Sequence, residues 1–376
     1  MPLAELLAPA IALAKDGFPV SPITAHGWAR GKHQLDRSPH GHELLLHGER
    51  VAWPRRSVEA VALQGGVLTL EDLAAHASTV VTPIKTTFRG VDVHEIPPNG
   101  QGIVALLALN ILNELLPEGA DDSTVARDSP EYLISWSRRC VSRSPTRSGT
   151  REYARARAAL IDRSRALVDP TRGSPELSCD TVSFQVVDAA GNAVSMVNSN
   201  YEGFGTGFVP RGCGFTLQNR GSNFRSTTLD TRTRWPPCKR PYHTIIPAIS
   251  TFADDSQALH ATFSVMGAFM QPQGHVQVLC NLLVHGLDPQ EAIDAPRVCV
   301  DAKSGATGES RVLLEDGVSP ETAHALATRF GHVIETRAGV GPRSVFGRGQ
   351  IIVRDRESGV LCAGSDGRAD GCAMGW

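Results

Sequence analysis

The sequence carries almost no net charge, no long hydrophobic run and no C-x-x-C motif. A formal net charge of −2 over 376 residues gives no electrostatic basis for binding nucleic acid or an anionic membrane. No apolar run approaches the ~18 residues that a membrane-spanning helix requires. The segment Met1–Leu7 contains an acidic residue and no basic residue, so it is not typical of a secretory signal. We therefore expect a cytoplasmic protein without nucleic-acid or membrane partners.

Metal and disulfide signatures are also scarce. The 8 cysteines show no zinc-ligand spacing, and without a secretory signal we expect reduced thiols rather than a disulfide framework. A polar segment, residues 27–56, is expected to be a long loop and carries four histidines, His33, His40, His42 and His47. Only His40 and His42 form a tight pair, and no carboxylate or cysteine completes a recognisable set of ligands. A solvated loop is therefore favoured over a metal site, and no cofactor is expected.

The composition is that of an ordinary globular protein with mixed helices and strands. Apolar residues make up 41% of the chain and charged residues 20%, and the length permits one large domain or two smaller ones. Residues 80–88 and 91–96 alternate about Arg89-Gly90 and predict a hairpin. Short helices are predicted after the capping residues Thr69, Asp288 and Ser319, the last two followed by proline.

Two glycine-containing connections lead into predicted helices. Residues 97–102 precede an apolar helix over 103–116, and two interpretations stay open here: an anion site at the helix start, or a plain strand-to-helix connection. Residues 266–275 separate a strand over 259–265 from a helix over 276–285. Backbone amides at that second helix start are suited to stabilising an oxyanion.

The stretch from Asp180 to Phe224 organises the rest of the chain. Residues 181–186 alternate between apolar and polar side chains, turn residues follow at 188–192, and a second apolar run covers 193–197. This pattern predicts a β-hairpin. Loops rich in glycine and polar residues follow at 199–207 and 217–224, as expected where backbone approaches a ligand. The spacing by itself specifies no particular chemistry.

The residue strings in this stretch resemble the start of the small subunit in the γ-glutamyltransferase family of N-terminal-nucleophile hydrolases. They are Asp-Thr-Val-Ser-Phe at 180–184, Val-Val-Asp-Ala-Ala-Gly-Asn-Ala-Val-Ser at 186–195 and Gly-Phe-Gly-Thr-Gly at 203–207. The run Met-Gln-Pro-Gln-Gly-His at 270–275, with Ser199-Asn200-Tyr201, is more similar to the bacterial amidohydrolase branch than to glutathione-cleaving transferases. The resemblance implies an α+β fold, a four-layer αββα sandwich, in which residues 1–180 and 181–376 correspond to the large and small subunits of one domain.

The resemblance also implies a precursor that cuts itself between Asp180 and Thr181. A threonine hydroxyl is a poor nucleophile and needs an adjacent base. The α-amino group that cleavage frees can serve, because its pKa of roughly 7.7–8.0 leaves a neutral fraction near pH 7. Thr181 would then attack an amide and carry the acyl group. The local sequence alone, without the resemblance, favours an ordinary strand threonine.

Further roles follow from the resemblance, residue by residue. Ser199 takes the place of the hydroxyl that supports the nucleophile, and Gly267 and Ala268 take the places of two oxyanion-hole glycines. Alanine is compatible with that role because the backbone amide does the work, provided its φ and ψ suit a residue with a Cβ. The remaining substrate-binding candidates are Tyr201, Arg220, Asn223, His243 and Thr244.

The expected substrate is a small amide whose acyl group carries a carboxylate. Family transferases hold the α-ammonium of a γ-glutamyl donor with an acidic side chain, and Asn223 stands at that position, three residues after Arg220. His243-Thr244 likewise replaces a serine pair. Losing a carboxylate and gaining a guanidinium disfavours a γ-glutamyl donor and favours an oxamate-like amide.

One departure from the family bears on activity. Family members carry a substantial portion ahead of the segment Leu3–Leu7, so an N-terminally truncated domain is expected. Apolar sheet surface exposed by a truncation favours association; we expect the two processed segments to stay together, and a homodimer is also considered. Two hypotheses remain: a self-processing amidohydrolase acting through Thr181, and a non-catalytic remnant or regulatory partner that is not processed.

Overall fold

The computed structural model describes residues 52–116, 129, 179–224, 239–302, 310–337 and 342–376. The four histidines considered as metal ligands, His33, His40, His42 and His47, lie outside the described residues. The loop expected over residues 27–56 is wrong at its end, because helix α4 (Ala52–Ala62) begins at Ala52. Pro54 is tolerated in the first turn of that helix, where its missing N–H has no intrahelical partner to lose.

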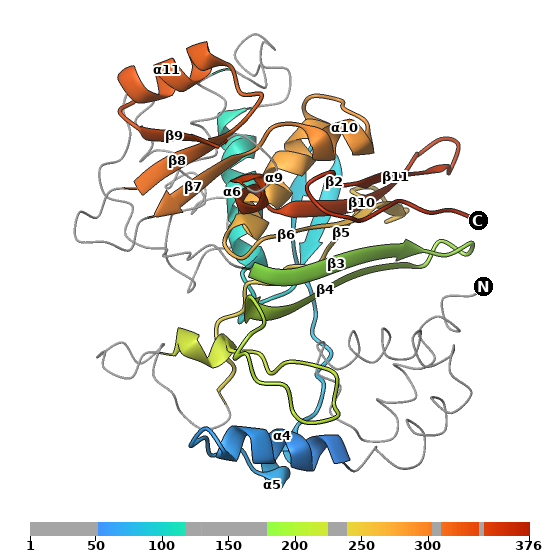
Figure 1. The fold of residues 1–376 in the computed structure, drawn as a ribbon. Helices are drawn as coiled ribbons and strands as arrows, with labels where there is room; N and C mark the ends of the chain where they lie inside the picture. Colours follow the sequence, from blue (N-terminus) through green and yellow to red (C-terminus); the bar gives the residue numbers. More distant parts are fainter. Residues whose placement is uncertain (1–51, 117–128, 130–178, 225–238, 303–309, 338–341) are drawn as a thin grey trace.

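A six-stranded antiparallel sheet forms the centre of the described part (Figure 1). Its strands in spatial order are β1 (Ile84–Phe88), β2 (Val91–Glu95), β5 (Ala248–Phe252), β6 (Leu259–Met266), β10 (Arg348–Arg354) and β11 (Leu361–Ser365). The hairpin expected about Arg89-Gly90 is confirmed as β1 and β2. Strand β1 starts later than predicted, after Pro83, which lacks the N–H that a strand interior needs.

The second predicted hairpin is confirmed as β3 (Cys179–Val187) and β4 (Ala193–Glu202). The carboxylate of Asp188 closes its turn by accepting the backbone N–H groups of Ala190 and Asn192 at 3.0 and 2.8 Å. Thr181 lies directly opposite Ser199, and the register shifts between Cys179 and Thr181. One extra residue of β4, between Ser199 and Glu202, therefore lies opposite the bond between residues 180 and 181.

The large sheet is covered differently on its two faces. Phe263 of β6 is buried in the main core with residues of α6 (Gly102–Leu115) and α9 (Met270–Leu283). Its neighbours Thr262 and Ser264 hydrogen-bond Gln185 of β3 at 2.8 and 2.9 Å. Because successive side chains of a strand point to opposite faces, the helices cover one face and the β3–β4 hairpin covers the other (Figure 1). Helices, sheet and hairpin are three layers of the expected αββα sandwich.

Helix α9 begins at Met270, six residues before the predicted start at residue 276. The proline and glycine in residues 270–275 favour a turn when the sequence alone is considered. Pro272 lies in the first turn, where proline costs little. Gly274 allows close packing instead of a turn, since a Cβ built on it would lie 2.4 Å from Cγ1 of Val265.

The remaining elements flank the sheet. The caps expected at Thr69, Asp288 and Ser319 are confirmed for α5 (Leu70–Ala75), α10 (Pro289–Asp294) and α11 (Pro320–Thr328). A three-stranded sheet that we did not predict contains β7 (Val298–Ala302), β8 (Ser310–Glu315) and β9 (Val333–Arg337). Within the described ranges, no helix is both long and apolar enough to span a membrane.

Candidate active site

The structure brings Thr181 and Ser199 together across the β3–β4 pair. Oγ1 of Thr181 donates a 2.9 Å hydrogen bond to Oγ of Ser199. The two residues are only 1% and 4% exposed, so bulk water does not compete for this bond. The Thr181 hydroxyl therefore has a fixed direction, next to the point where the pairing of β3 with β4 becomes irregular.

The oxygen of Ser199 accepts hydrogen bonds from three sides. Besides the Thr181 hydroxyl, the backbone N–H of Tyr201 donates to it at 2.9 Å and Nη2 of Arg220 donates at 3.1 Å. Tyr201 has a φ of +80°, which is uncommon for a residue with a Cβ. Unusual backbone of this kind gathers at functional sites, where the surroundings hold it in place.

Arg220 is the buried cation of this group. It is 1% exposed and is the first residue of the short 3₁₀ helix η3 (Arg220–Asn223). Its Nη1 donates to Oγ1 of Thr244 at 3.0 Å, and its guanidinium carbon lies 4.8 Å from the centre of the Tyr201 ring. A guanidinium keeps its charge at every physiological pH, so a permanent positive charge lies beside the two hydroxyls.

Asn223 and His243 complete the surroundings of Arg220. The Tyr201 hydroxyl donates to Oδ1 of Asn223 at 2.9 Å. Nδ1 of His243 accepts the backbone N–H of Ile245 at 3.3 Å. Burial, reinforced by the charge of Arg220, lowers the pKa of His243 to about 3. His243 is therefore neutral near pH 7, and Arg220 supplies the positive charge here.

Gly267 and Ala268 form the turn between β6 and α9, which we call the Gly267–Ala268 turn. Their φ angles are +144° and +48°, and the second is unfavourable for a residue with a Cβ. Gly347 packs against the turn, since a Cβ built on Gly267 would lie 2.9 Å from Cα of Gly347. The turn directly precedes α9, where the first N–H groups of a helix lack intrahelical partners and carry partial positive charge.

Sequence reasoning missed Gln101, which connects the two halves of this site. Its Nε2 donates to the carbonyl oxygens of Thr244 and Ala268 at 2.8 and 3.1 Å. The loop that contains Gln101 was visible as the glycine-containing connection 97–102, but its contacts were not. At the start of α6, Oε2 of Glu95 lies 3.0 Å from a Cβ built on Gly102. A side chain at residue 102 would therefore collide with Glu95, and both interpretations of this connection stay open.

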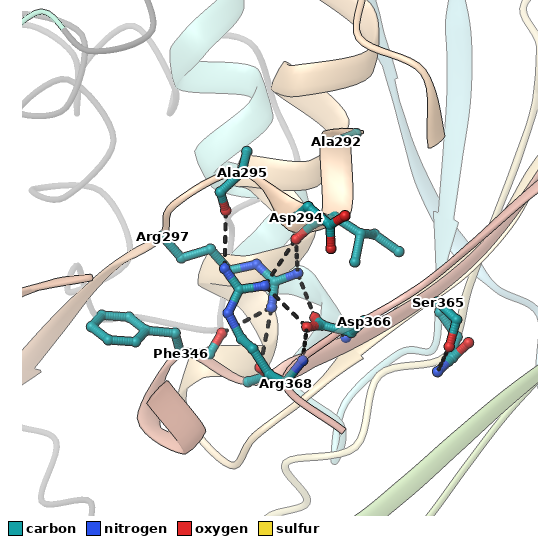
Figure 2. Close-up of polar contacts among 12 residues, drawn as sticks. Ala292, Asp294, Ala295, Arg297, Phe346, Ser365, Asp366 and Arg368 are labelled. Atoms are coloured by element: carbon teal, nitrogen blue, oxygen red, sulfur yellow. Dashed lines mark hydrogen bonds and ion pairs between the residues drawn. The ribbon is translucent and has the colours of Figure 1, made fainter. Parts of the chain in front are cut away.

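A buried charge network holds Gly347, which packs against the Gly267–Ala268 turn. Figure 2 shows the part of this network around Arg297, Asp366 and Arg368. Nη1 of Arg297 donates to the carbonyl oxygens of Phe346 and Gly347 at 3.1 and 3.2 Å, and Nη2 binds Asp366 at 2.7 Å. Nη1 of Arg368 donates to the same carboxylate at 3.0 Å, and its Nε donates to Glu315 at 2.7 Å. The network fixes Gly347 relative to the C-terminal strand and the smaller sheet.

The structure thus gathers most of the candidate residues into one connected group. Those joined through Ser199 and Arg220 are Thr181, Tyr201, Asn223, His243 and Thr244. Gly267 and Ala268 connect to them through Gln101. The backbone of Asp180 lies in β3, and its side chain is outside the description. No three metal-binding side chains are grouped in the part of the chain that the structure covers.

Comparison with known proteins identifies the family. The model of the gamma-glutamyltranspeptidase family matches residues 54–376. A glutathione hydrolase-like YwrD proenzyme of Bacillus subtilis is 29% identical, over 99% of this chain and 76% of its own length. An oxamate amidohydrolase proenzyme of Klebsiella pneumoniae is 28% identical, over 100% of this chain and 76% of its own length.

A solved structure, the cephalosporin acylase from Bacillus halodurans, is 34% identical and superposes with a TM-score of 0.74 over 100% of this chain and 75% of that one. These relatives confirm the expected α+β fold and support the expectation of a hydrolase that acts on amide bonds. The chain belongs to the γ-glutamyltranspeptidase family and has the fold of the N-terminal-nucleophile hydrolases.

Proposed function

We propose that this chain is a self-processing threonine amidohydrolase whose substrates are small amides with a carboxylate near the scissile carbonyl. The observation that carries the proposal is the buried chain of hydrogen bonds from Thr181 through Ser199 to Arg220. It supports the proposal because it gives the Thr181 hydroxyl, the proposed nucleophile, a fixed direction beside a cation of the kind that binds carboxylates.

Self-processing would begin with attack of Oγ1 of Thr181 on the carbonyl carbon of residue 180. The C–N bond of that peptide breaks, an ester to Oγ1 forms, and the nitrogen of Thr181 takes up the proton to become an amine. Water then hydrolyses the ester to a carboxylate on residue 180 and restores the hydroxyl. The extra residue of β4 opposite this bond supports the proposal, because it interrupts the regular strand pairing there. Relatives named as proenzymes support it as well.

The freed amine of Thr181 then serves as the base for substrate cleavage. It accepts the Oγ1 proton while the oxygen attacks the amide carbon, and the proton leaves with the departing nitrogen. The resulting ester is hydrolysed by water, which restores Thr181 and releases the acid. Ser199 orients the hydroxyl, and the amides of the Gly267–Ala268 turn stabilise the negative oxygen of the intermediate.

The position of Arg220 limits the length of the acyl group. Two hydrogen bonds in series, of 2.9 and 3.1 Å, keep Nη2 of Arg220 within about 6 Å of Oγ1 of Thr181. A short acyl group can place its reacting carbon beside Oγ1 and its carboxylate beside the guanidinium without a long chain folded between them. We therefore propose oxamate or malonamate and disfavour the longer γ-glutamyl group, which would have to fold between these two points. The Klebsiella relative, an oxamate amidohydrolase proenzyme, agrees with this choice.

The first test is the intact mass and N-terminal sequence of purified protein after incubation. We expect two fragments, one beginning Thr-Val-Ser-Phe, and a single uncut chain from the Thr181→Ala variant. An uncut wild-type chain would overturn the self-processing proposal and favour the non-catalytic remnant.

The second test measures ammonia release from oxamate, malonamate, succinamate and glutaramate. We expect kcat/KM to fall about tenfold or more between malonamate and glutaramate, the amount that one lost charged contact readily costs. Arg220→Met should remove the preference for short acids. Arg311→Met is the matched control, because Arg311 pairs with Glu335 in the smaller sheet. Equal rates on all four amides would refute the proposed limit on acyl length.

A further inference from the structure

Gln101 occupies an unusual position for a residue at the start of a helix. It immediately precedes α6, yet its side chain makes no capping bond to that helix. It is 3% exposed, and a buried polar side chain costs free energy unless its groups are hydrogen-bonded. The side chain must therefore find its partners elsewhere in the fold.

All the hydrogen-bonding groups of the Gln101 amide are directed at two other loops. Nε2 donates to the carbonyl oxygens of Thr244 and Ala268, and Oε1 accepts the Tyr242 hydroxyl. An NH₂ group has two hydrogens, so both are used on carbonyls from separate segments. Only a side chain with an NH₂ group and a carbonyl oxygen at this reach can make the three contacts together.

One of those carbonyls belongs to the strained turn. Ala268 has a φ of +48°, so its conformation needs support from the surroundings. Gly347 supports the turn on one side through its contact with Gly267, and Gln101 holds the Ala268 carbonyl. Holding that carbonyl fixes the plane of the following peptide, because the peptide group is planar.

The other carbonyl belongs to the loop that contacts Arg220. Oγ1 of Thr244 accepts from Nη1 of Arg220, while the backbone oxygen of the same residue is held by Gln101. Asn99, two residues before Gln101, reinforces the connection by donating from Nδ2 to the Pro241 carbonyl at 2.6 Å. The amide group of Gln101 therefore connects the loop that contains Thr244 to the Gly267–Ala268 turn.

We propose that Gln101 is a positioning residue that fixes the position of the Gly267–Ala268 turn relative to Thr244 and Arg220. Its effect on catalysis rests on the function proposed above, whereas its effect on the turn does not. Gln101 does not touch the reacting atoms. It acts through Ala268 and Thr244, so its loss should reduce the rate of the chemical step more than the affinity for substrate.

The test compares Gln101→Glu with Gln277→Glu. Gln277 is also a buried glutamine whose Nε2 donates to two backbone carbonyls, of Gln273 and Val298, but it lies further along α9. Both changes replace the same donors by a carboxyl group. We expect Gln101→Glu to lower kcat by about 10- to 100-fold, within the range of oxyanion-hole defects, with KM changed by less than about threefold. In Gln277→Glu, kcat per folded molecule should be unchanged.

A pH profile separates positioning from general damage. A buried carboxyl group has a raised pKa, and its protonated form regains one donor for a carbonyl. The kcat deficit of Gln101→Glu should therefore be smaller at pH 5 than at pH 8. Equal kcat in the two variants, or a deficit confined to KM, would overturn the proposal.

A crystal structure of the double variant Thr181→Ala, Gln101→Met gives a readout that needs no activity. The Thr181→Ala single variant is the reference. We expect the Ala268 peptide to rotate away from its positive φ when the amide is removed. An unchanged turn would show that Gln101 does not hold it, even if the wild-type protein proved inactive on every amide.

Discussion

The hydroxyl of Thr181 donates its hydrogen bond to Ser199, the residue directly opposite it in the β3–β4 pair. The bond thus depends on strand register as well as on side-chain identity. A slip of either strand by one residue would turn its hydroxyl to the other face of the hairpin, away from its partner. The register of this hairpin is accordingly part of the candidate site.

Replacement of Ser199 should slow self-cleavage without unfolding the protein. Ser199→Ala removes the acceptor for Thr181, Tyr201 and Arg220, and we expect a roughly 100-fold slower cleavage, as for loss of a group that orients proton transfer. Ser199→Thr keeps a hydroxyl and should retain most of the rate. Mass spectrometry over a time course measures both.

Ser195 provides the matched control for that experiment. It lies on the same strand, and its hydroxyl donates to the carbonyl of Phe263 at 3.0 Å and accepts the N–H of Ala248 at 3.2 Å. Ser195→Ala should lower the melting temperature but leave cleavage of the folded protein unchanged. If both variants slow cleavage equally, Ser199 acts only through stability.

A side chain at residue 347 should disturb the Gly267–Ala268 turn. Gly347 has a φ of +73°, and a Cβ there would lie 2.6 Å from the carbonyl oxygen of Met266. Gly347→Ala should cost about 1–3 kcal/mol from overpacking beyond the backbone strain, and it should lower kcat. Chemical unfolding and steady-state rates test this.

Gly286→Ala separates the backbone strain from the clash. Gly286 has a similar φ of +63° but nothing within 4 Å of its Cβ position. Gly286→Ala should therefore lower the free energy of unfolding by about 1 kcal/mol, which is the backbone strain alone. A loss equal to that of Gly347→Ala would mean that contact with Met266 is unimportant.

Removing one arginine from the buried network should be strongly destabilising. Arg368 binds Asp366 and Glu315 with its side chain only 1% exposed, and the positive charges around them lower the pKa values of both acids. Arg368→Met leaves buried carboxylates undercompensated, which costs about 3–5 kcal/mol. Arg356→Met is the control, because Arg356 is 65% exposed in its pair with Asp254, and such pairs contribute about 0–1 kcal/mol. Similar unfolding midpoints for the two variants would contradict this prediction.

The buried pair of Glu95 and His275 predicts a pH-dependent stability. Oε1 of Glu95 lies 2.8 Å from Nδ1 of His275, with both side chains fully buried. Burial raises the pKa of Glu95 well above its ordinary value of 4.5 and lowers the pKa of His275 from 6.5 to about 3. Burial therefore favours the neutral form of both groups in the folded protein, where they share one hydrogen bond.

The two groups stabilise the folded protein over different pH ranges, Glu95 at low pH and His275 at high pH. The contribution of Glu95 is complete below its ordinary pKa and is lost as pH rises through the higher pKa of the folded state. That of His275 is complete above pH 6.5 and is lost as pH falls toward about 3. Glu95→Gln removes only the pH dependence that Glu95 contributes. The variant should therefore gain stability relative to wild type as pH rises from 5 to 9. Unfolding midpoints at several pH values test this, with the exposed Glu357→Gln as control; parallel profiles would contradict it.

Local signals account for what the sequence predicted well. The caps at Thr69, Asp288 and Ser319 involve residues three apart, and the hairpins depend on alternation and a short turn. The contacts of Gln101 join residues 143 and 167 positions apart, which no local pattern encodes. The same limit applies to β8, which pairs with β9 in parallel across α11. The sequence identified the candidate residue types. The hydrogen bonds among them join residues far apart in the chain and could be seen only in the folded structure.

The main core is built from both sides of the bond between residues 180 and 181. Phe88, Leu109 and Leu112 come from before it, and Phe263 and Leu279 come from after it. Once that bond is cut, the folded molecule contains two chains, and its unfolding releases two particles instead of one. Mass action then makes the melting temperature of processed protein fall on dilution, while that of an uncut Thr181→Ala chain stays constant.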